Sequence, residues 1–428
     1  MDDTYLLTPH EAVEFVRSAT ALFPPQADLE ISEIAGNQRS VEGYINAIYR
    51  IADRETGRSV VLKQYRRFIK GAEKGHRDVP LSLARMRVEI EAFKLWNVIC
   101  PGSVPELYAW DEERAILIME DLSHLKLARF EFARRKQFPE FARQVGQFLG
   151  RTAFFTSDLY LDPGDKKRLV QGFTNPEYRQ LIERVIFDRF LDPALDEPVN
   201  PGIRDDLQAF LADEQVLLEL LRLKEAYVVR AQSLIHNDFH TANIFLGPEE
   251  MKVFDAEGAF IGPTAYDIGQ LYGNLILSCM SLQVLDDISV SEKIDYEDYL
   301  LRTMEELTHE FERSFCAAWD ECVRPVYRGS RHYRADYLRR ILQDAAGYAA
   351  ILALSRIYDP GMSYDFSRIP DLQQRAVGQR LVIQTARQLL LDRERFQTVE
   401  DIAALLKQIK IEHKVKSLVR EKLTALSS

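Results

Sequence analysis

One short segment, residues 234–260, constrains this chain more than any other. Its sequence is LIHNDFHTANIFLGPEEMKVFDAEGAF, in which strand-type apolar residues flank a Gly247-Pro248 turn. The sequence on either side is predominantly helical, so this segment is a β-type interruption that carries polar side chains into an apolar setting. Carboxylates in such a setting require partners. The segment therefore predicts a functional site.

The polar residues of this segment match the needs of phosphoryl transfer. That chemistry needs a carboxylate to orient the attacking hydroxyl, and oxygen ligands to hold Mg²⁺ against the phosphates. We expect Asp238 to be the catalytic base, with Asn243 and Asp255 as metal ligands. In an extended chain Glu257 shares a face with Asp255, so it is expected to join the metal site.

The chain divides into a β-rich part and a helical part. Residues 29–121 alternate apolar strands with turn-forming residues around one helix, expected from Leu81 to Trp96. The helices expected beyond residue 121 are Phe138–Phe155, Pro176–Phe190, Ile203–Ala226, Tyr296–Trp319 and Tyr333–Tyr358. This pattern predicts an α+β fold with two lobes: residues 1–121 bind nucleotide, and residues 122–428 carry catalysis and substrate binding.

The β-rich lobe is expected to supply a lysine to the nucleotide phosphates. Lys63 lies in the apolar strand SVVLKQY, where a charged group needs a partner. A glutamate of the following helix would provide it, Glu89 in preference to Glu91. Upstream, Gly43 and Asn46 belong to a turn that is expected to lie over the phosphates.

The end of this lobe is expected to bind the adenine of ATP. The apolar strand Ala115–Met119 runs directly into Glu120-Asp121-Leu122. A linker strand has unpaired backbone groups to offer, so the backbone of Glu120 and Leu122 would hydrogen bond the adenine edge. The expected cofactors are ATP and Mg²⁺.

Composition excludes several other classes of protein. The 428 residues include 55 basic and 66 acidic side chains, a formal net charge of −11, which argues against a nucleic-acid partner. No apolar run approaches a bilayer span and the acidic N-terminus does not resemble a signal peptide, so we expect a cytoplasmic protein with no membrane contact. The four cysteines have no CxxC spacing, which predicts neither a zinc site nor a disulfide framework. His236 and His240 are expected to support the loop around Asp238.

Several motifs carry a resemblance to a known family. The run FDAEGAFIGPTAYDIGQLYGNL at 254–275, with IMEDL at 118–122, TSDL at 156–159 and NPEY at 175–178, is similar to the methylthioribose kinases. These enzymes belong to the aminoglycoside phosphotransferase and choline kinase group, which has a bilobal protein-kinase-like fold. The resemblance covers most of the chain. It implies ATP-dependent phosphorylation of the anomeric hydroxyl of methylthioribose, and a homodimer.

The resemblance also assigns roles to single residues. It implies that Asp267 anchors the loop around Asp238 through backbone amides. Asn237 stands where the family usually has glycine, and Ala242-Asn243 stands where it tends toward Gly-Ser. The family's paired arginines near the sugar align with Ser355 and Arg356, so one arginine is missing. We expect both positions to act on the substrate, and serine differs from arginine in charge and reach.

Two alternative functions stay open at this point. One is an aminoglycoside or amino-alcohol phosphotransferase of the same fold, and the other is a catalytically silent nucleotide-binding homologue. The joint presence of Lys63, Asp238, Asn243 and Asp255 favours an active kinase, because a silent protein does not need all four. The expected partner is a small, sugar-like molecule with a free hydroxyl.

Overall fold

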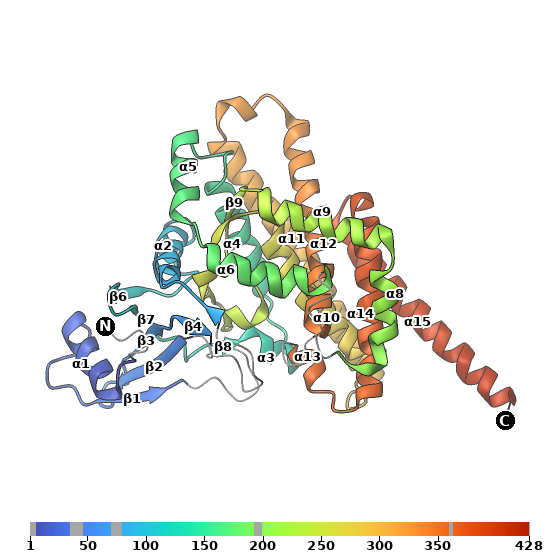
Figure 1. Cartoon of the computed structure of the whole chain (residues 1–428), viewed down its shortest axis with the longest axis horizontal. Coiled ribbons are helices and arrows are strands. Elements are labelled where there is room, and N and C mark those ends of the chain that lie inside the picture. The colour runs from blue at the N-terminus through green and yellow to red at the C-terminus, as the bar shows by residue number, and fades with distance from the viewer. Residues whose placement is uncertain (1–5, 35–45, 70–78, 192–198, 359–362, 428) are drawn as a thin grey trace.

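The N-terminal part of the chain is built on one antiparallel sheet. The computed structural model describes residues 6–34, 46–69, 79–191, 199–358 and 363–427. Within them, five strands form a sheet of order β1-β2-β3-β7-β6 (Figure 1). The strands are β1 (Leu29–Glu33), β2 (Asn46–Asp53), β3 (Ser59–Tyr65), β6 (Leu107–Asp111) and β7 (Ile116–Glu120).

The alternation of β3 gives the sheet two buried faces. Val60 and Leu62 join one apolar cluster, while Val61 and Tyr65 join another, because successive side chains of a strand point to opposite faces. Helix α1 (Pro9–Ala19) contributes to the first cluster, and α2 (Ala84–Ile99) to the second. Lys63 has the parity of Val61, so its side chain lies on the face that meets α2.

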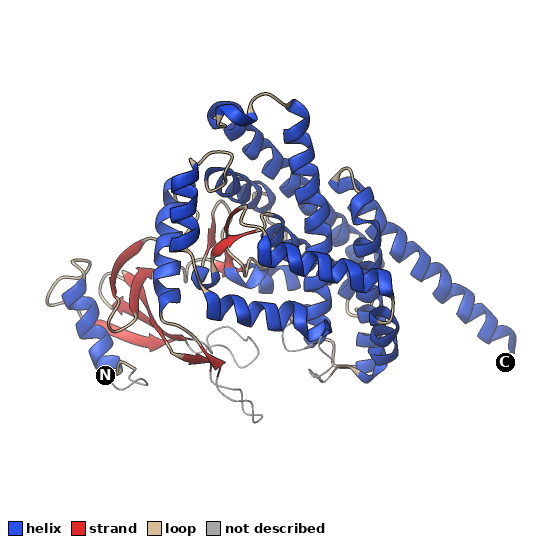
Figure 2. Ribbon diagram, turned by 45° about the horizontal axis from the view of Figure 1, so that its top comes forward, coloured by secondary structure: helices blue, strands red, loops and turns tan. Residues whose placement is uncertain are grey.

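The remainder of the chain is mostly helical, and Figure 2 shows this helical body beside the sheet. The predicted α+β class is confirmed. The helices are α3 (Ala128–Ala133), α4 (Phe141–Phe155), α5 (Pro163–Gly172), α6 (Pro176–Ile182), α7 (Arg189–Leu191), α8 (Arg204–Leu211), α9 (Glu214–Val229), α10 (Ala265–Leu282), α11 (Val290–Cys322), α12 (Arg331–Tyr358), α13 (Tyr364–Ser367), α14 (Leu372–Asp392) and α15 (Val399–Ser427).

Helix α10 lies at the centre of this body, and every residue of it is buried. It approaches α12 closely through small residues one turn apart. A Cβ at Gly269 would lie 2.5 Å from the Cβ of Tyr348, and one at Gly273 would lie 3.0 Å from the carbonyl oxygen of Ala349. A side chain at either glycine would therefore push the two helices apart.

The predicted single helix Ile203–Ala226 is wrong, because the chain breaks there into α8 and α9. Asp213 caps α9, and its carboxylate accepts the amide hydrogen of Gln215 at 3.0 Å. An aspartate favours this N-cap position because it satisfies an amide that has no partner within the helix. The break therefore has a local cause that the apolar periodicity does not reveal.

The predicted β-type interruption is confirmed as two small sheets. In one, β9 (Ser233–Ile235) pairs with β12 (Phe260–Gly262), and in the other, β10 (Ile244–Leu246) lies between β8 (Lys126–Leu127) and β11 (Met251–Val253). The loop 236–243 joins the two sheets, so a strand fixes each end of this polar loop.

The last helix, α15, extends away from the body toward the C-terminus (Figure 1). Its outer part exposes Ile411, Val415 and Val419, which follow one another at helical spacing. Across the described residues, no helix has both the length and the apolar character of a membrane span. All four cysteines are free.

Candidate active site

One face of α10 holds the backbone of the loop 236–243. The carboxylate of Asp267 accepts the amide hydrogens of His236 and Asn237 at 2.6 and 3.0 Å. Further along the same face, the side-chain oxygen of Gln270 accepts the amide of Phe239. The anchoring role expected for Asp267 is therefore observed in its hydrogen bonds, and it is shared with other residues of the helix.

Asn274 completes this support, one turn further along α10. Its side-chain oxygen accepts both the amide and the hydroxyl hydrogen of Thr241, at 2.9 and 2.7 Å. Asp267, Gln270 and Asn274 share one face of the helix because their spacing of three and four residues follows the helical repeat. Polar residues at this spacing in a buried helix are the sequence signal that could have revealed them.

Asp238 lies in this loop with both carboxylate oxygens in contact with neighbours. Asn243 Nδ2 donates to the carbonyl oxygen of Asp238 at 2.9 Å and to its Oδ2 at 3.2 Å. Oδ1 lies 3.1 Å from Nε2 of His240. Since the Nδ2 of Asn243 makes both contacts with Asp238, the Oδ1 of Asn243 remains as an acceptor.

The surroundings of Asp238 keep its carboxyl group ionised. Burial raises the pKa of this carboxyl, but the nearby His240, Arg356 and His236 outweigh burial and hold the pKa well below its ordinary value. The side chain is nevertheless 24% exposed. An ionised, partly accessible carboxylate can accept a hydrogen bond from a hydroxyl group.

His236 connects this loop to the strand before Asp255. Its Nε2 faces the carbonyl oxygen of Phe254 at 2.9 Å, and its Nδ1 accepts the amide hydrogen of Asp238 at 3.2 Å. Its ring stacks on Trp96 of α2, with the centroids 5.9 Å apart. These contacts are those of a residue that supports the loop.

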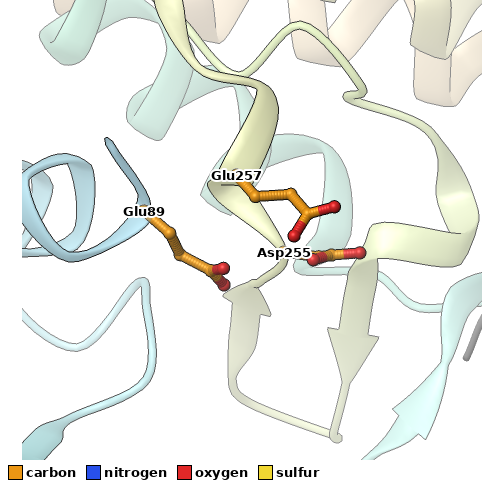
Figure 3. Close-up of side chains that lie close together, drawn as sticks. All are labelled: Glu89, Asp255 and Glu257. Atoms are coloured by element: carbon orange, nitrogen blue, oxygen red, sulfur yellow. The ribbon is translucent and has the colours of Figure 1, made fainter. Parts of the chain in front are cut away.

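Lys63 is surrounded by three carboxylates, which point toward one another in Figure 3. Its Nζ lies 2.6 Å from Glu89, 2.5 Å from Asp255 and 3.8 Å from Glu257. The expected pair with Glu89 is thus formed, whereas Glu91 is exposed and pairs with Lys94 at 2.9 Å. The ammonium group already lies among the carboxylates, so they form an ion-pair cluster in this conformation.

Burial and charge act in opposite directions within this cluster. Burial lowers the pKa of Lys63, but the carboxylates of Asp255, Glu89 and Glu257 raise it above its ordinary value, so the amine stays charged. Burial raises the pKa of Glu89 to about 7 although Lys63 opposes the change. Tyr65 also donates its hydroxyl hydrogen to Glu89. Glu89 is therefore fixed by two donors.

The turn that follows Asp255 is not extended, so the argument that placed Glu257 by strand alternation is wrong. Asp255 adopts a left-handed conformation with φ of 63°, and Ala256–Gly258 form a 3₁₀ turn. The carboxylates of Asp255 and Glu257 still have oxygens within 4.8 Å of each other. The 3₁₀ turn, rather than a strand, brings them together.

Glu257 is tied to the N-terminal part of the chain. Its Oε2 accepts from Asn46 Nδ2 at 2.9 Å and from Arg85 Nε at 3.1 Å, and Arg85 also donates to Asn46 at 2.7 Å. Asn46 thus lies beside the carboxylate cluster, at the start of β2. Gly43, its expected companion over the phosphates, lies outside the described residues.

The strand end 120–122 is fixed by ion pairs on both sides. Lys252 lies 2.6 Å from Glu120, and Arg50 lies 2.6 Å from Asp121, whose side chain is 5% exposed. The amide of Leu122 donates to no backbone or side-chain group in the described part of the chain. A group with these properties is available to an adenine edge.

Ser355 and Arg356 lie near the end of α12, and both are buried. The Ser355 hydroxyl donates to the carbonyl oxygen of Leu352 at 2.8 Å, while Arg189 donates to the carbonyl oxygen of Ser355 at 3.1 Å. The hydroxyl is therefore engaged by its own helix. Arg356 is close enough to Asp238 for their charges to interact.

Comparison with known proteins decides the family. Residues 38–285 match the model of the phosphotransferase enzyme family. A methylthioribose kinase from Geobacillus kaustophilus is 32% identical over 85% of this chain and 89% of its own length. One from Geobacillus sp. is 30% identical over 90% of this chain and 92% of its own. The chain belongs to the methylthioribose kinase family.

The comparison with solved structures is more distant. A choline kinase from Cryptosporidium parvum Iowa II is 14% identical, the match covers 94% of this chain and 99% of that chain, and the TM-score is 0.47.

Membership of the methylthioribose kinase family makes this chain an ATP-dependent phosphotransferase with an alcohol group as acceptor, which uses ATP and Mg²⁺. The expected bilobal, kinase-like fold is thereby confirmed.

Several residues of this candidate site were not predicted from the sequence. Arg85 and Tyr65 bind the carboxylates of the cluster, and Asn175 donates to the carbonyl oxygen of Glu257 at 2.7 Å. Arg85 has the appearance of a solvated helix residue in a charged stretch, yet it is 1% exposed. Its partner lies 172 residues away in the sequence, so no local signal indicates its role.

Proposed function

We propose that this kinase transfers the γ-phosphate of ATP to a hydroxyl of methylthioribose or a related pentose, with Asp238 as the base. The observation that carries the proposal is the pairing of Asp238 with Asn243. The Nδ2 of Asn243 donates to two oxygens of Asp238, which holds the base and leaves the Asn243 Oδ1 for a metal ion. The proposed lobes are residues 1–121 for nucleotide and residues 122–428 for catalysis and acceptor.

The chain's own groups fit the chemistry of Mg²⁺. Asn243 Oδ1, Asp255 and the Oε1 of Glu257 are oxygen donors, and Asp255 is 33% exposed. A bound Mg²⁺ would neutralise charge on the phosphates. Lys63 lies beside Asp255 and would supply a positive charge to the phosphates, while Glu89 keeps it in place.

Asp238 would act on the acceptor through its accessible carboxylate. It is ionised at neutral pH, so it would accept the hydrogen bond of the acceptor hydroxyl and orient its oxygen toward the γ-phosphate. It would take the proton as the new oxygen–phosphorus bond forms and the bond from the γ-phosphorus to the leaving ADP breaks. Gly43, Asn46 and the backbone of Glu120 and Leu122 complete the proposed nucleotide site.

Charge near Asp238 favours a neutral sugar over a cationic acceptor. Arg356 is 5% exposed, and both Arg356 and Arg129 act on His240 as positive charges. These positive charges oppose the attraction of a ligand's amino groups to the negative Asp238, which lies at the same place. We propose that Arg356 contacts the sugar, with the short side chain of Ser355 widening the space beside it.

The test is ATP consumption with methylthioribose, deoxypentoses, amino sugars and aminoglycosides, using the wild type, Asp238→Asn and Asp295→Asn. Asp295 is exposed on α11 and makes no ion pair in the described structure, so its variant is the matched control. We expect turnover of a pentose that Asp238→Asn lowers at least 100-fold and Asp295→Asn does not change. Full turnover by Asp238→Asn would refute the mechanism, and turnover of amino sugars alone would refute the acceptor. Binding of Mg-ATP without turnover of any acceptor would support a silent homologue.

The proposed homodimer is a separate prediction. Ile411, Val415 and Val419 form an exposed apolar stripe on the projecting α15, of a kind that a second copy can cover. Light scattering on the full chain and on its Val415→Lys variant measures the oligomeric state. A monomeric wild type would contradict the prediction.

A further inference from the structure

His240 is a buried residue that uses its two ring nitrogens for different contacts. Its side chain is 7% exposed. Nδ1 accepts the amide hydrogen of Ala242 at 3.2 Å and so caps the 3₁₀ turn Thr241–Asn243. Nε2 lies 3.1 Å from Oδ1 of Asp238. The ring is therefore placed between the turn and the carboxylate.

The cap determines which nitrogen of a neutral ring carries hydrogen. A nitrogen that accepts the Ala242 amide has no hydrogen of its own, so the hydrogen of the neutral ring lies on Nε2. That nitrogen faces Asp238, which makes the contact one between a donor and a carboxylate oxygen. The backbone cap thus presets the tautomer that suits Asp238.

The carboxylate of Asp238 has one other described side-chain donor, the amide of Asn243 at 3.2 Å on Oδ2. A carboxylate held at a single oxygen can rotate about its side-chain bonds, whereas contacts at both oxygens fix its plane. Small errors in the placement of a catalytic group cost large factors in rate. Two-point support therefore matters for a base that must meet an acceptor hydroxyl.

We propose that His240 is a positioning residue, which orients the carboxylate of Asp238 through Nε2 while Nδ1 caps the following turn. The inference rests on the proposed role of Asp238. It predicts that the two contacts of the ring can be separated by two substitutions, because asparagine and glutamine each place one polar group at one of the two nitrogen positions.

His240→Asn keeps the cap and removes the contact with Asp238. The Oδ1 of asparagine reaches the position of Nδ1, and asparagine is a favoured N-cap residue, but its side chain is too short to reach Asp238. His240→Gln places an amide nitrogen near the position of Nε2 and loses the cap. If His240 only capped the turn, His240→Asn would stay active. If His240 positions Asp238, His240→Gln is the more active of the two variants.

The experiment measures kcat, KM and Tm for wild type, His240→Asn, His240→Gln and the exposed control His309→Asn. Methylthioribose and ATP are the substrates. The slow hydrolysis of ATP by water is measured as a second activity. We expect His240→Asn to keep its Tm and KM while kcat falls at least tenfold, and His240→Gln to regain a substantial part of kcat despite a lower Tm. His309→Asn should match the wild type.

Wild-type kcat in His240→Asn would overturn the inference, and so would a kcat in His240→Gln no higher than that in His240→Asn. Asp238→Asn in the same assays separates the two proposals. If Asp238→Asn keeps its turnover, the proposed base itself is wrong. If Asp238→Asn is inactive while His240→Asn is fully active, only the positioning role is wrong.

Discussion

Replacement of Asn237 by glycine is expected to destabilise the fold, although the backbone at this position suits glycine. Asn237 has φ of 70°, in the left-handed region that glycine adopts freely and asparagine tolerates. Its side chain accepts the hydroxyl hydrogen of Tyr227 at 2.8 Å and donates to the carbonyl oxygen of Gly258 at 3.0 Å. Both contacts are buried, and glycine would remove both.

The size of the effect follows from these two contacts. Tyr227 has no exposed surface, so its hydroxyl would be left without water or a partner. Leaving a buried polar group unpaired costs about 1–3 kcal/mol, so two such groups give a loss on the order of 2–6 kcal/mol. Asn237→Ala should lose about 1 kcal/mol more, because alanine lacks glycine's freedom in the left-handed region.

Calorimetry of wild type, Asn237→Gly, Asn237→Ala, Tyr227→Phe and the double variant Asn237→Gly/Tyr227→Phe measures these terms. The single glycine variant should lower Tm by on the order of 5 °C. The double variant should be less destabilised than the sum of its parts, because removal of both partners leaves no unpaired hydroxyl. A glycine variant as stable as the wild type, or strict additivity with Tyr227→Phe, would refute the reasoning.

Two further predictions concern buried charges. Glu89→Gln frees Lys63 to move fully onto Asp255, so we expect at least a tenfold loss of kcat/KM for ATP, with exposed Glu91→Gln within about twofold of wild type; steady-state kinetics measures both. Burial lowers the pKa of Lys166 to about 8 in the folded chain, against about 10.5 in the unfolded chain. Between these two pH values the unfolded chain binds more protons than the folded chain. The contribution of Lys166 to the free energy of unfolding therefore rises with pH in this range. Relative to Lys166→Met, the wild type should gain about 2–3 kcal/mol between pH 7.5 and 10.5 in denaturant titrations; a constant difference would contradict the assignment.

The strands and the polar loop of residues 234–260 could be predicted from the sequence because polar residues interrupt apolar strands at fixed spacing. The pairing of Lys63 with Glu89 follows equally from local patterns, since an isolated lysine in a buried strand requires a carboxylate. The face of α10 was only partly predicted. The anchoring role was expected for Asp267 but not for Gln270 and Asn274, because uncharged amides in an apolar helix do not by themselves indicate such a role.

The conformation of the 255–258 turn could not be predicted in the same way. The sequence favours an extended strand, and the left-handed φ of Asp255 depends on packing that local propensity does not contain. Gly258 illustrates the constraint, because a Cβ there would lie 2.4 Å from the ring of Tyr178. The approach of these two residues is a property of the assembled fold.

The same turn gives its two carboxylates different tasks. Asp255 is 33% exposed and has one oxygen on Lys63, whereas Glu257 is 1% exposed and has one oxygen on Arg85 and Asn46. In the proposed metal site, an ion would therefore reach Asp255 from solvent, but it would reach Glu257 only through the remaining oxygen. Arg85 lies on α2 and Asn46 begins β2, so a change at Glu257 would reach the N-terminal part of the chain through hydrogen bonds. If Glu257 holds Mg²⁺ as proposed, loss of Arg85 would weaken both metal binding and the position of Asn46, two effects that loss of a metal ligand alone would not combine.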